Sequence, residues 1–212
     1  MINENLTNYL IQLLPAQENW VVELERQATE EHVPIMDPVS MHLLTQIIRI
    51  QKPERILEIG TAIGYSALRM LQANSEATVV TIERDWSRYR KAIANIKKLE
   101  KQDKIDVIFG DALETAENIT AKGPFDLLFI DAAKGQYERF FTLYSQTVAK
   151  GGLIITDNVL FKGYVEEPSK EHPRFTKLGQ KIRHYNDWLI KNPDYMTSIV
   201  PIGDGVAISI KK

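Results

Sequence analysis

Hydrophobic residues follow two periods along this chain, and the two periods alternate from residue 55 onward. Short apolar runs, typical of buried strands, are followed by stretches in which apolar residues recur every three or four positions, as on one face of a helix. The expected strands are 55–59, 78–83, 105–109, 125–131 and 152–157. The expected helices are 64–73, 85–100, 111–121 and 136–149. Repeated strand and helix units predict an α/β fold with helices on both faces of a mostly parallel sheet.

The N-terminal part of the chain is expected to be helical throughout. Apolar residues have helical spacing over 2–14 and 16–32, and a proline separates the two stretches. Asp37, followed by a proline, is a good N-cap for a third helix over 38–51. We therefore treat residues 1–35 as a helical extension whose apolar face covers a sheet edge or a second subunit.

The C-terminal part predicts a hairpin. A helix is expected at about 175–191, and the apolar runs 197–202 and 206–210 flank the turn sequence Gly203-Asp204-Gly205. Such a hairpin adds one antiparallel strand to an otherwise parallel sheet. The whole of 1–212 is expected to form a single domain, a length that suits one α/β unit.

Composition narrows the chemistry and the compartment. The chain has no cysteine, which excludes disulfides, thiolate catalysis and cysteine-ligated metals and agrees with a reducing compartment. We see neither a signal-peptide pattern nor a run of about 20 apolar residues, so we expect a cytoplasmic protein without a membrane span. The net charge is −2, but 84–104 carries eight Lys or Arg against three acids, and 160–191 carries seven against four. A nucleic acid would fit these basic segments, although most basic helix faces are simply solvated.

The turn after the first strand has the features of a ligand-binding turn. Gly60 and Gly64 allow the backbone to bend tightly and approach a ligand. Their spacing is not the three-glycine dinucleotide fingerprint, which disfavours a nicotinamide dehydrogenase. The carboxylate of Glu58 would repel a pyrophosphate, so a ligand with cationic groups fits better. S-adenosylmethionine is the candidate, and an ordinary strand-to-helix turn is the alternative.

Acidic residues stand at or just after the ends of all five expected strands. They are Glu58, Glu83, Asp111, Asp131 and Asp157. Ligands of open α/β sheets bind along this edge, so the five acids indicate one site, although Asp111 alone would also serve as a helix N-cap. Glu83 lies where a carboxylate commonly takes ribose hydroxyls. Ser66, at a helix start, would bond either a ligand carboxylate or the local backbone.

Asp131, Asp157 and Asn158 form a candidate metal site. Two carboxylates and an amide offer only oxygen donors, which suit Mg²⁺ or Ca²⁺ better than zinc. Lys134, three residues after Asp131, is expected to point into the same crevice. The four histidines show no paired spacing for a transition metal.

The motifs along the chain resemble those of a known family, the metal-dependent O-methyltransferases of the catechol and caffeoyl-coenzyme A type. The resemblance runs from about Met36 to the C-terminus. The matching pieces are Leu57-Glu-Ile-Gly60, Gly64-Tyr-Ser-Ala67, the strand ending in Glu83, Gly110-Asp-Ala112, Ile130-Asp-Ala-Ala-Lys134, Thr156-Asp-Asn158 and Gly203-Asp-Gly-Val206.

This resemblance implies a Rossmann-like class I methyltransferase with a seven-stranded sheet whose last strand is antiparallel, and it suggests a homodimer. It implies that S-adenosyl-L-methionine is surrounded by Met36, Glu58, Gly60, Gly64, Ser66, Glu83, Asp111, Ala112 and Asp131. Asp131, Asp157 and Asn158 would hold Mg²⁺, with Ca²⁺ or Mn²⁺ as substitutes, and Lys134 would be the catalytic general base.

The short chain resembles the bacterial enzymes that methylate 5-hydroxyuridine at the wobble position of tRNA. Animal catechol enzymes carry bulky residues where this chain has Ala132 and Ala133, which weakens the alternative of a small catechol or caffeoyl-type phenol. A non-catalytic RNA-binding module is a third hypothesis. For tRNA, the candidate phosphate contacts near the anticodon are Arg84, Arg88, Lys97, Lys98, Lys162, Arg174, Lys177 and Arg183.

Overall fold

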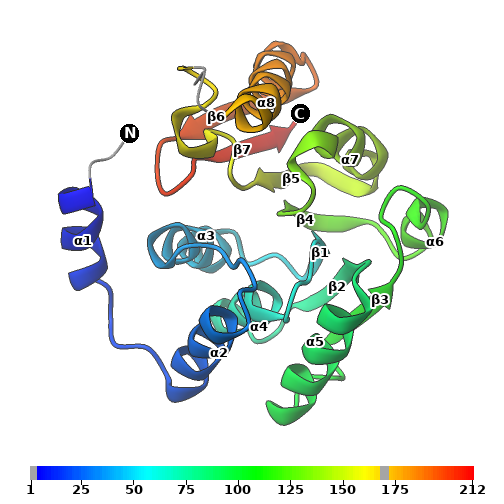
Figure 1. Cartoon of the computed structure of the whole chain (residues 1–212). Helices are drawn as coiled ribbons and strands as arrows, with labels where there is room; N and C mark the ends of the chain where they lie inside the picture. Colours follow the sequence, from blue (N-terminus) through cyan, green and yellow to red (C-terminus); the bar gives the residue numbers. More distant parts are fainter. Residues whose placement is uncertain (1–3, 168–171) are drawn as a thin grey trace.

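A computed structural model describes residues 4–167 and 172–212 and shows a seven-stranded sheet between two layers of helices (Figure 1). The strands are β1 Arg55–Ile59, β2 Thr78–Glu83, β3 Ile105–Phe109, β4 Phe125–Ile130, β5 Val148–Thr156, β6 Tyr195–Val200 and β7 Val206–Lys211. Their order across the sheet is β3-β2-β1-β4-β5-β7-β6. β1 to β5 are parallel, whereas β7 runs antiparallel to both β5 and β6. The predicted α/β class and the C-terminal hairpin are confirmed.

Eight α-helices and three short 3-10 helices occur in the part of the chain that the structure describes. The α-helices are α1 Glu4–Gln12, α2 Asn19–Glu30, α3 Pro38–Gln51, α4 Tyr65–Ala73, α5 Trp86–Lys98, α6 Ala116–Thr120, α7 Tyr137–Tyr144 and α8 Pro173–Lys191. The 3-10 helices are Lys134–Gln136, Ser145–Thr147 and Phe161–Gly163. None of the described helices is long and apolar enough to cross a membrane.

Two hydrophobic cores lie on opposite faces of the sheet because successive strand residues point to opposite sides. In β1, Ile56 joins a core shared with α2, α3, α4 and α5, whereas Leu57 joins a core shared with α6, α7 and α8. In β4, Phe129 and Leu128 divide in the same way. Both faces are therefore covered, as the nearly continuous apolar strands require.

Three predicted boundaries differ from the structure by four or more residues. The helix expected at 111–121 is only the five residues of α6, because Asp111 organises a turn before it: its side chain accepts from the Leu113 N–H at 2.9 Å, and its carbonyl accepts from the Thr115 N–H. The helix expected at 136–149 ends at Tyr144, and β5 begins at Val148 instead of residue 152. The start of β5 is partly exposed and its pairing with β4 shifts register, so it lacks the apolar pattern of a buried strand.

The N-terminal helices are placed differently from one another. α2 packs onto α4 and α5 and does not cover a sheet edge; Glu25 accepts a hydrogen bond from the Tyr65 hydroxyl at 2.7 Å, and Glu23 pairs with Lys98 at 2.7 Å. α1 lies beside α3 at the side of the molecule (Figure 1); Tyr9 of α1 and Leu13, directly after it, are exposed. The expectation of a second subunit against this extension stays a prediction.

Candidate functional site

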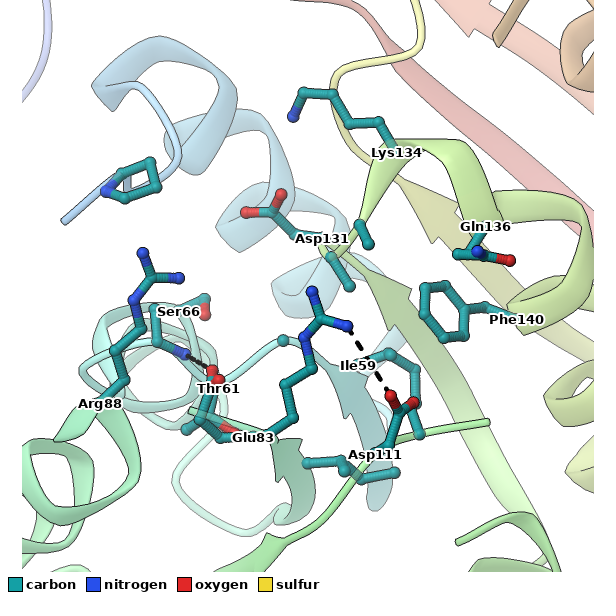
Figure 2. A pocket seen from close by; sticks show the side chains of 18 of the residues that line it. Ile59, Thr61, Ser66, Glu83, Arg88, Asp111, Asp131, Lys134, Gln136 and Phe140 are labelled. Carbon is teal, nitrogen blue, oxygen red and sulfur yellow. Dashed lines mark hydrogen bonds and ion pairs between the residues drawn. The ribbon is translucent and has the colours of Figure 1, made fainter. Parts of the chain in front are cut away.

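A cavity of about 480 Å³ opens at the carboxyl ends of β1, β2, β3 and β4 (Figure 2). It lies where the chain's strand order reverses, since β1 is flanked by β2 on one side and by β4 on the other. This is the position at which open α/β sheets bind their ligands. Nine of the residues predicted for the site line it: Met36, Gly60, Ser66, Glu83, Asp111, Ala112, Asp131, Lys134 and Asn158.

The two glycines of the turn after β1 have different surroundings. Gly60 has a φ of +106°, and a Cβ there would lie 2.9 Å from the carbonyl carbon of Asp131 and closer still to its oxygen. The turn and the end of β4 therefore approach each other as only glycine allows. Gly64, the N-cap of α4, has a φ of +85°; a Cβ built there would lie 3.6 Å from Ala92 of α5, and Gly64 does not line the cavity.

Glu58 lies one layer beneath the cavity. It is fully buried, and its carboxylate accepts hydrogen bonds from the Ser66 hydroxyl and, at 2.6 Å, from the Thr81 hydroxyl. Burial is the main cause that raises the pKa of Glu58 to about 7, and the negative charges of Asp131 and Glu83 add to it. Because the Ser66 hydrogen is directed to Glu58, Ser66 presents its lone pairs to the cavity, which suits a ligand amino group better than a ligand carboxylate.

The carboxylate of Glu83 is held rigidly at the cavity wall. One oxygen accepts from the Ala62 N–H and the other from the Asp85 N–H, both at 2.8 Å. Each oxygen keeps further lone pairs, so the group can accept from two neighbouring hydroxyls of a ligand. Next to it, Asp111 lies 3.7 Å from Arg84, which also lines the cavity (Figure 2).

Asp131, Asp157 and Asn158 come together as predicted, although Asp157 does not line the cavity. The Asn158 amide donates to Asp157 at 2.7 Å and approaches Asp131 at 3.4 Å. Burial raises the pKa of both carboxyls, that of Asp157 well above its usual range; Asp131 raises the pKa of Asp157 further, while Lys134 lowers both.

These three residues fit a hard divalent cation by their chemistry. Two neighbouring carboxylates, one buried and one partly buried, are costly without a compensating positive charge. Asn158 now presents its nitrogen to both, and half a turn of the amide would present its oxygen instead. Over residues 4–167 and 172–212, no group of three or more His, Cys, Asp or Glu side chains could hold a metal, so this mixed set is the metal candidate.

Lys134 stands at the mouth of the cavity. Figure 2 shows its side chain extending from the loop that also carries Asp131. Its ammonium group makes no hydrogen bond or ion pair with another described residue.

Sequence reasoning missed several lining residues. Thr61, Gln136 and Phe140 also line the cavity. The sequence around Phe140 does not predict this position, because the direction of its side chain depends on how α7 packs against the sheet.

Comparison with known proteins gives consistent results along nearly the whole chain. The model of a family described as O-methyltransferase matches residues 15–212. The caffeoyl-CoA O-methyltransferase of Stellaria longipes is 29% identical, over 96% of this chain and 89% of the relative. The catechol O-methyltransferase of Niastella koreensis is 27% identical, over 100% of this chain and 98% of the relative.

Solved structures agree with these relatives. A Staphylococcus aureus protein, provisionally assigned as a caffeoyl-CoA O-methyltransferase, is 38% identical with a TM-score of 0.89, covering 97% of this chain and 99% of the other. An O-methyltransferase from Bacillus cereus, in complex with SAH, is 26% identical with a TM-score of 0.85, covering 98% and 97%.

Proposed function

From the premise that the chain belongs to the O-methyltransferase family, and is thus an S-adenosylmethionine-dependent methyltransferase, we propose that it methylates a hydroxyl lying next to a second oxygen. The observation that carries this proposal is the mixed oxygen site of Asp131, Asp157 and Asn158 beside Lys134 at one end of the cavity. Two adjacent substrate oxygens are the partner that such a site would take.

The residues of the cavity divide between the two substrates in this proposal. Glu83 takes the ribose hydroxyls of S-adenosylmethionine, and Ser66, oriented by Glu58, accepts from its amino group. Asp111 and Ala112 lie farther along the same wall, and Met36 closes it from the loop before α3. Asp131 stands between the cofactor and the acceptor.

Asp131, Asp157 and Asn158 would hold Mg²⁺, with Ca²⁺ or Mn²⁺ as substitutes. When bound, such a cation supplies Lewis acidity that lowers the pKa of the acceptor hydroxyl. Lys134, in its neutral form, accepts the hydroxyl proton while the oxygen–methyl bond forms and the methyl–sulfur bond breaks. The side chains around the cavity fix the two reacting groups in line and exclude water.

The acceptor that we propose is 5-hydroxyuridine at the wobble position in the tRNA anticodon. Its hydroxyl lies beside a ring carbonyl, which gives the required pair of oxygens. Ala132 and Ala133 line the acceptor end of the cavity and leave it without a bulky wall for a small ring. Of the basic residues predicted to meet RNA, Arg84 and Arg88 line the cavity, whereas Lys98 pairs with Glu23 at the far end of α5.

A second candidate acceptor is a small catechol or a caffeoyl-type phenol. The names of the relatives favour it, because they include a catechol and a caffeoyl-CoA O-methyltransferase. Membership in an enzyme family counts against the third hypothesis, a non-catalytic RNA-binding module.

One assay separates the acceptors. Labelled S-adenosylmethionine and Mg²⁺ are incubated with tRNA that carries 5-hydroxyuridine and, in parallel, with catechols and caffeoyl thioesters. We expect label in the tRNA and its loss when a chelator is added. Label confined to the phenols would overturn the tRNA proposal, and undiminished transfer in chelator would overturn the metal site.

We also propose a homodimer that buries the exposed side of α1 and the residue after it, because Tyr9 is 55% and Leu13 62% exposed. Light scattering at micromolar concentration tests it. A monomer would contradict the proposal.

A further inference from the structure

A second hollow of about 460 Å³ adjoins the acceptor end of the cavity. We call it the α7–α8 groove, because its walls are residues 134–138, at and before the start of α7, and residues 177–185 of α8. Lys134 lines both the groove and the cavity. The two hollows therefore meet at Lys134, and a molecule held in the cavity has the groove next to it.

Three lysines and one acid line the groove, and Lys134 also lies near Asp131 and Asp157, whose pKa values it lowers. Lys134, Lys177 and Lys181 line it, and no hydrogen bond or ion pair joins any of them to another residue within 4–167 or 172–212. The acidic group facing them is Glu138, whose carboxylate is 3.7 Å from the Nε2 of His184. Lys177 and Lys181 are one turn apart on α8, where like charges repel in the absence of an anion.

A glycine brings two of these lysines close together. A Cβ at Gly135 would lie 3.9 Å from the Cδ of Lys181 and 4.0 Å from its Nζ. The Lys181 side chain therefore lies across the peptide that directly follows Lys134. Positive charge from α8 is in this way concentrated beside the residue proposed as the base.

We propose that the α7–α8 groove binds a phosphate group of the acceptor, which in an RNA acceptor is a backbone phosphate next to the methylated nucleotide. This rests on the proposed function, because the groove is placed to meet whatever the cavity methylates. A phosphate offers several acceptor oxygens, which the ammonium groups of Lys177 and Lys181 on α8 can share while Lys134 stays free to act as the base. Lysines contact the backbone independently of sequence, so the groove would contribute affinity while the cavity reads the base.

The test compares two double variants with the same change of charge. Lys177→Ala/Lys181→Ala removes the α8 side of the groove and leaves Lys134 intact. The control, Lys101→Ala/Lys150→Ala, removes two exposed lysines that line neither hollow. The probe is an anticodon stem-loop RNA carrying 5-hydroxyuridine, and the free 5-hydroxyuridine nucleoside is the acceptor without a phosphate.

Fluorescence anisotropy gives the Kd for the RNA at several salt concentrations, and initial rates give KM and kcat for both acceptors. We expect the groove variant to bind RNA about tenfold or more weakly, with the slope of log Kd against log salt reduced by about 0.7, the value for one neutralised phosphate on a single strand. Its KM should rise for RNA alone, and its kcat on the nucleoside should match the wild type. If both double variants weakened RNA binding equally, or if neither weakened it, the proposal that the groove binds phosphate would be overturned.

Failure of the proposed tRNA function has a different result. In that case the wild type labels no RNA but labels a phenol, and the same variants are then assayed on caffeoyl-coenzyme A and on a caffeoyl thioester that lacks phosphate. A raised KM confined to caffeoyl-coenzyme A would keep the phosphate groove and assign its phosphate to a nucleotide thioester. Unchanged KM values on both thioesters would overturn the proposal that the groove binds phosphate as well.

Discussion

Replacing Gly60 with alanine tests how strictly the turn after β1 positions Asp131. Gly60 has a φ of +106°, which alanine adopts only with strain of about 1–3 kcal/mol. The new Cβ would lie 2.9 Å from the Asp131 carbonyl carbon. Since non-bonded carbons pack at roughly 3.5–4.0 Å, the Asp131 backbone must retreat by about 1 Å. That residue both faces the cavity and belongs to the proposed metal site.

We expect Gly60→Ala to lower both stability and rate. Overpacking adds about 1–3 kcal/mol to the strain, so the free energy of unfolding should fall by about 2–6 kcal/mol. A shift of about 1 Å in a positioned group lowers kcat by about 100-fold. Urea unfolding measures the first effect, and single-turnover methyl transfer at saturating S-adenosylmethionine measures the second.

Gly151→Ala is the matched control. Gly151 also has a positive φ, +78°, but nothing lies within 4 Å of a Cβ built there. We expect it to show only the strain of about 1–3 kcal/mol and an unchanged kcat. If Gly60→Ala matched this control in both stability and kcat, the argument that Gly60 positions Asp131 would be refuted.

Three further predictions concern the acidic residues and the lysine. The folded protein keeps a proton on Glu58 up to about pH 7, whereas the unfolded chain loses it near pH 4.5, so stability should fall by about 3 kcal/mol between these pH values and then level off. Urea unfolding across that range should show no such fall in Glu58→Gln, and an unchanged fall would exclude Glu58 as its source. Asp157→Ala should lose more single-turnover rate than Lys134→Ala. Alignment of the reacting groups lowers the barrier by about 7–11 kcal/mol, whereas a general base accelerates the reaction by only about 10²–10⁴-fold, roughly 3–5 kcal/mol. Equal losses of rate would contradict this division. Glu83→Ala should weaken S-adenosylmethionine binding by about 10–100-fold in calorimetry, since charged hydrogen bonds contribute about 1.5–3 kcal/mol, and a change below twofold would exclude Glu83 as a contact.

Much of the fold follows from local signals in the sequence. The strands over 78–83 and 105–109 were predicted to the residue, because β-branched or apolar runs end there in polar or glycine residues. The helix over 38–51 was also predicted, and its cap is present: Asp37 accepts from the Val39 and Ser40 N–H groups at 3.0 Å. The boundaries that failed, around α6 and the start of β5, depend on a side-chain turn and on a register shift, which leave no periodic pattern.

The sequence predicts at which edge of the sheet the site lies, but not which of its acids line the cavity and which lie beneath it. Parallel strands bring their carboxyl ends together, so acids at successive strand ends had to converge. Whether an acid reaches the cavity depends on its neighbours: Glu58 is covered by Ser66 and Thr81, and Asp157 is covered as well, while Asp131 reaches the cavity. The α7–α8 groove joins residues 39 to 51 positions apart, and Lys177 and Lys181 gave no signal beyond a locally basic composition.

The place of β7 in the sheet determines the order in which this protein can be completed during synthesis. In the described part of the sheet, β6 is joined to the other strands only through β7, which is made after it. The turn before β7 also holds the segment that follows Asn158, because the Val159 and Leu160 N–H groups bond to the carbonyls of Gly205 and Asp204. The segment after Asn158 therefore gains these two hydrogen bonds only once residues 204 and 205 have been made, so the end of the cavity that we propose for the acceptor is completed last.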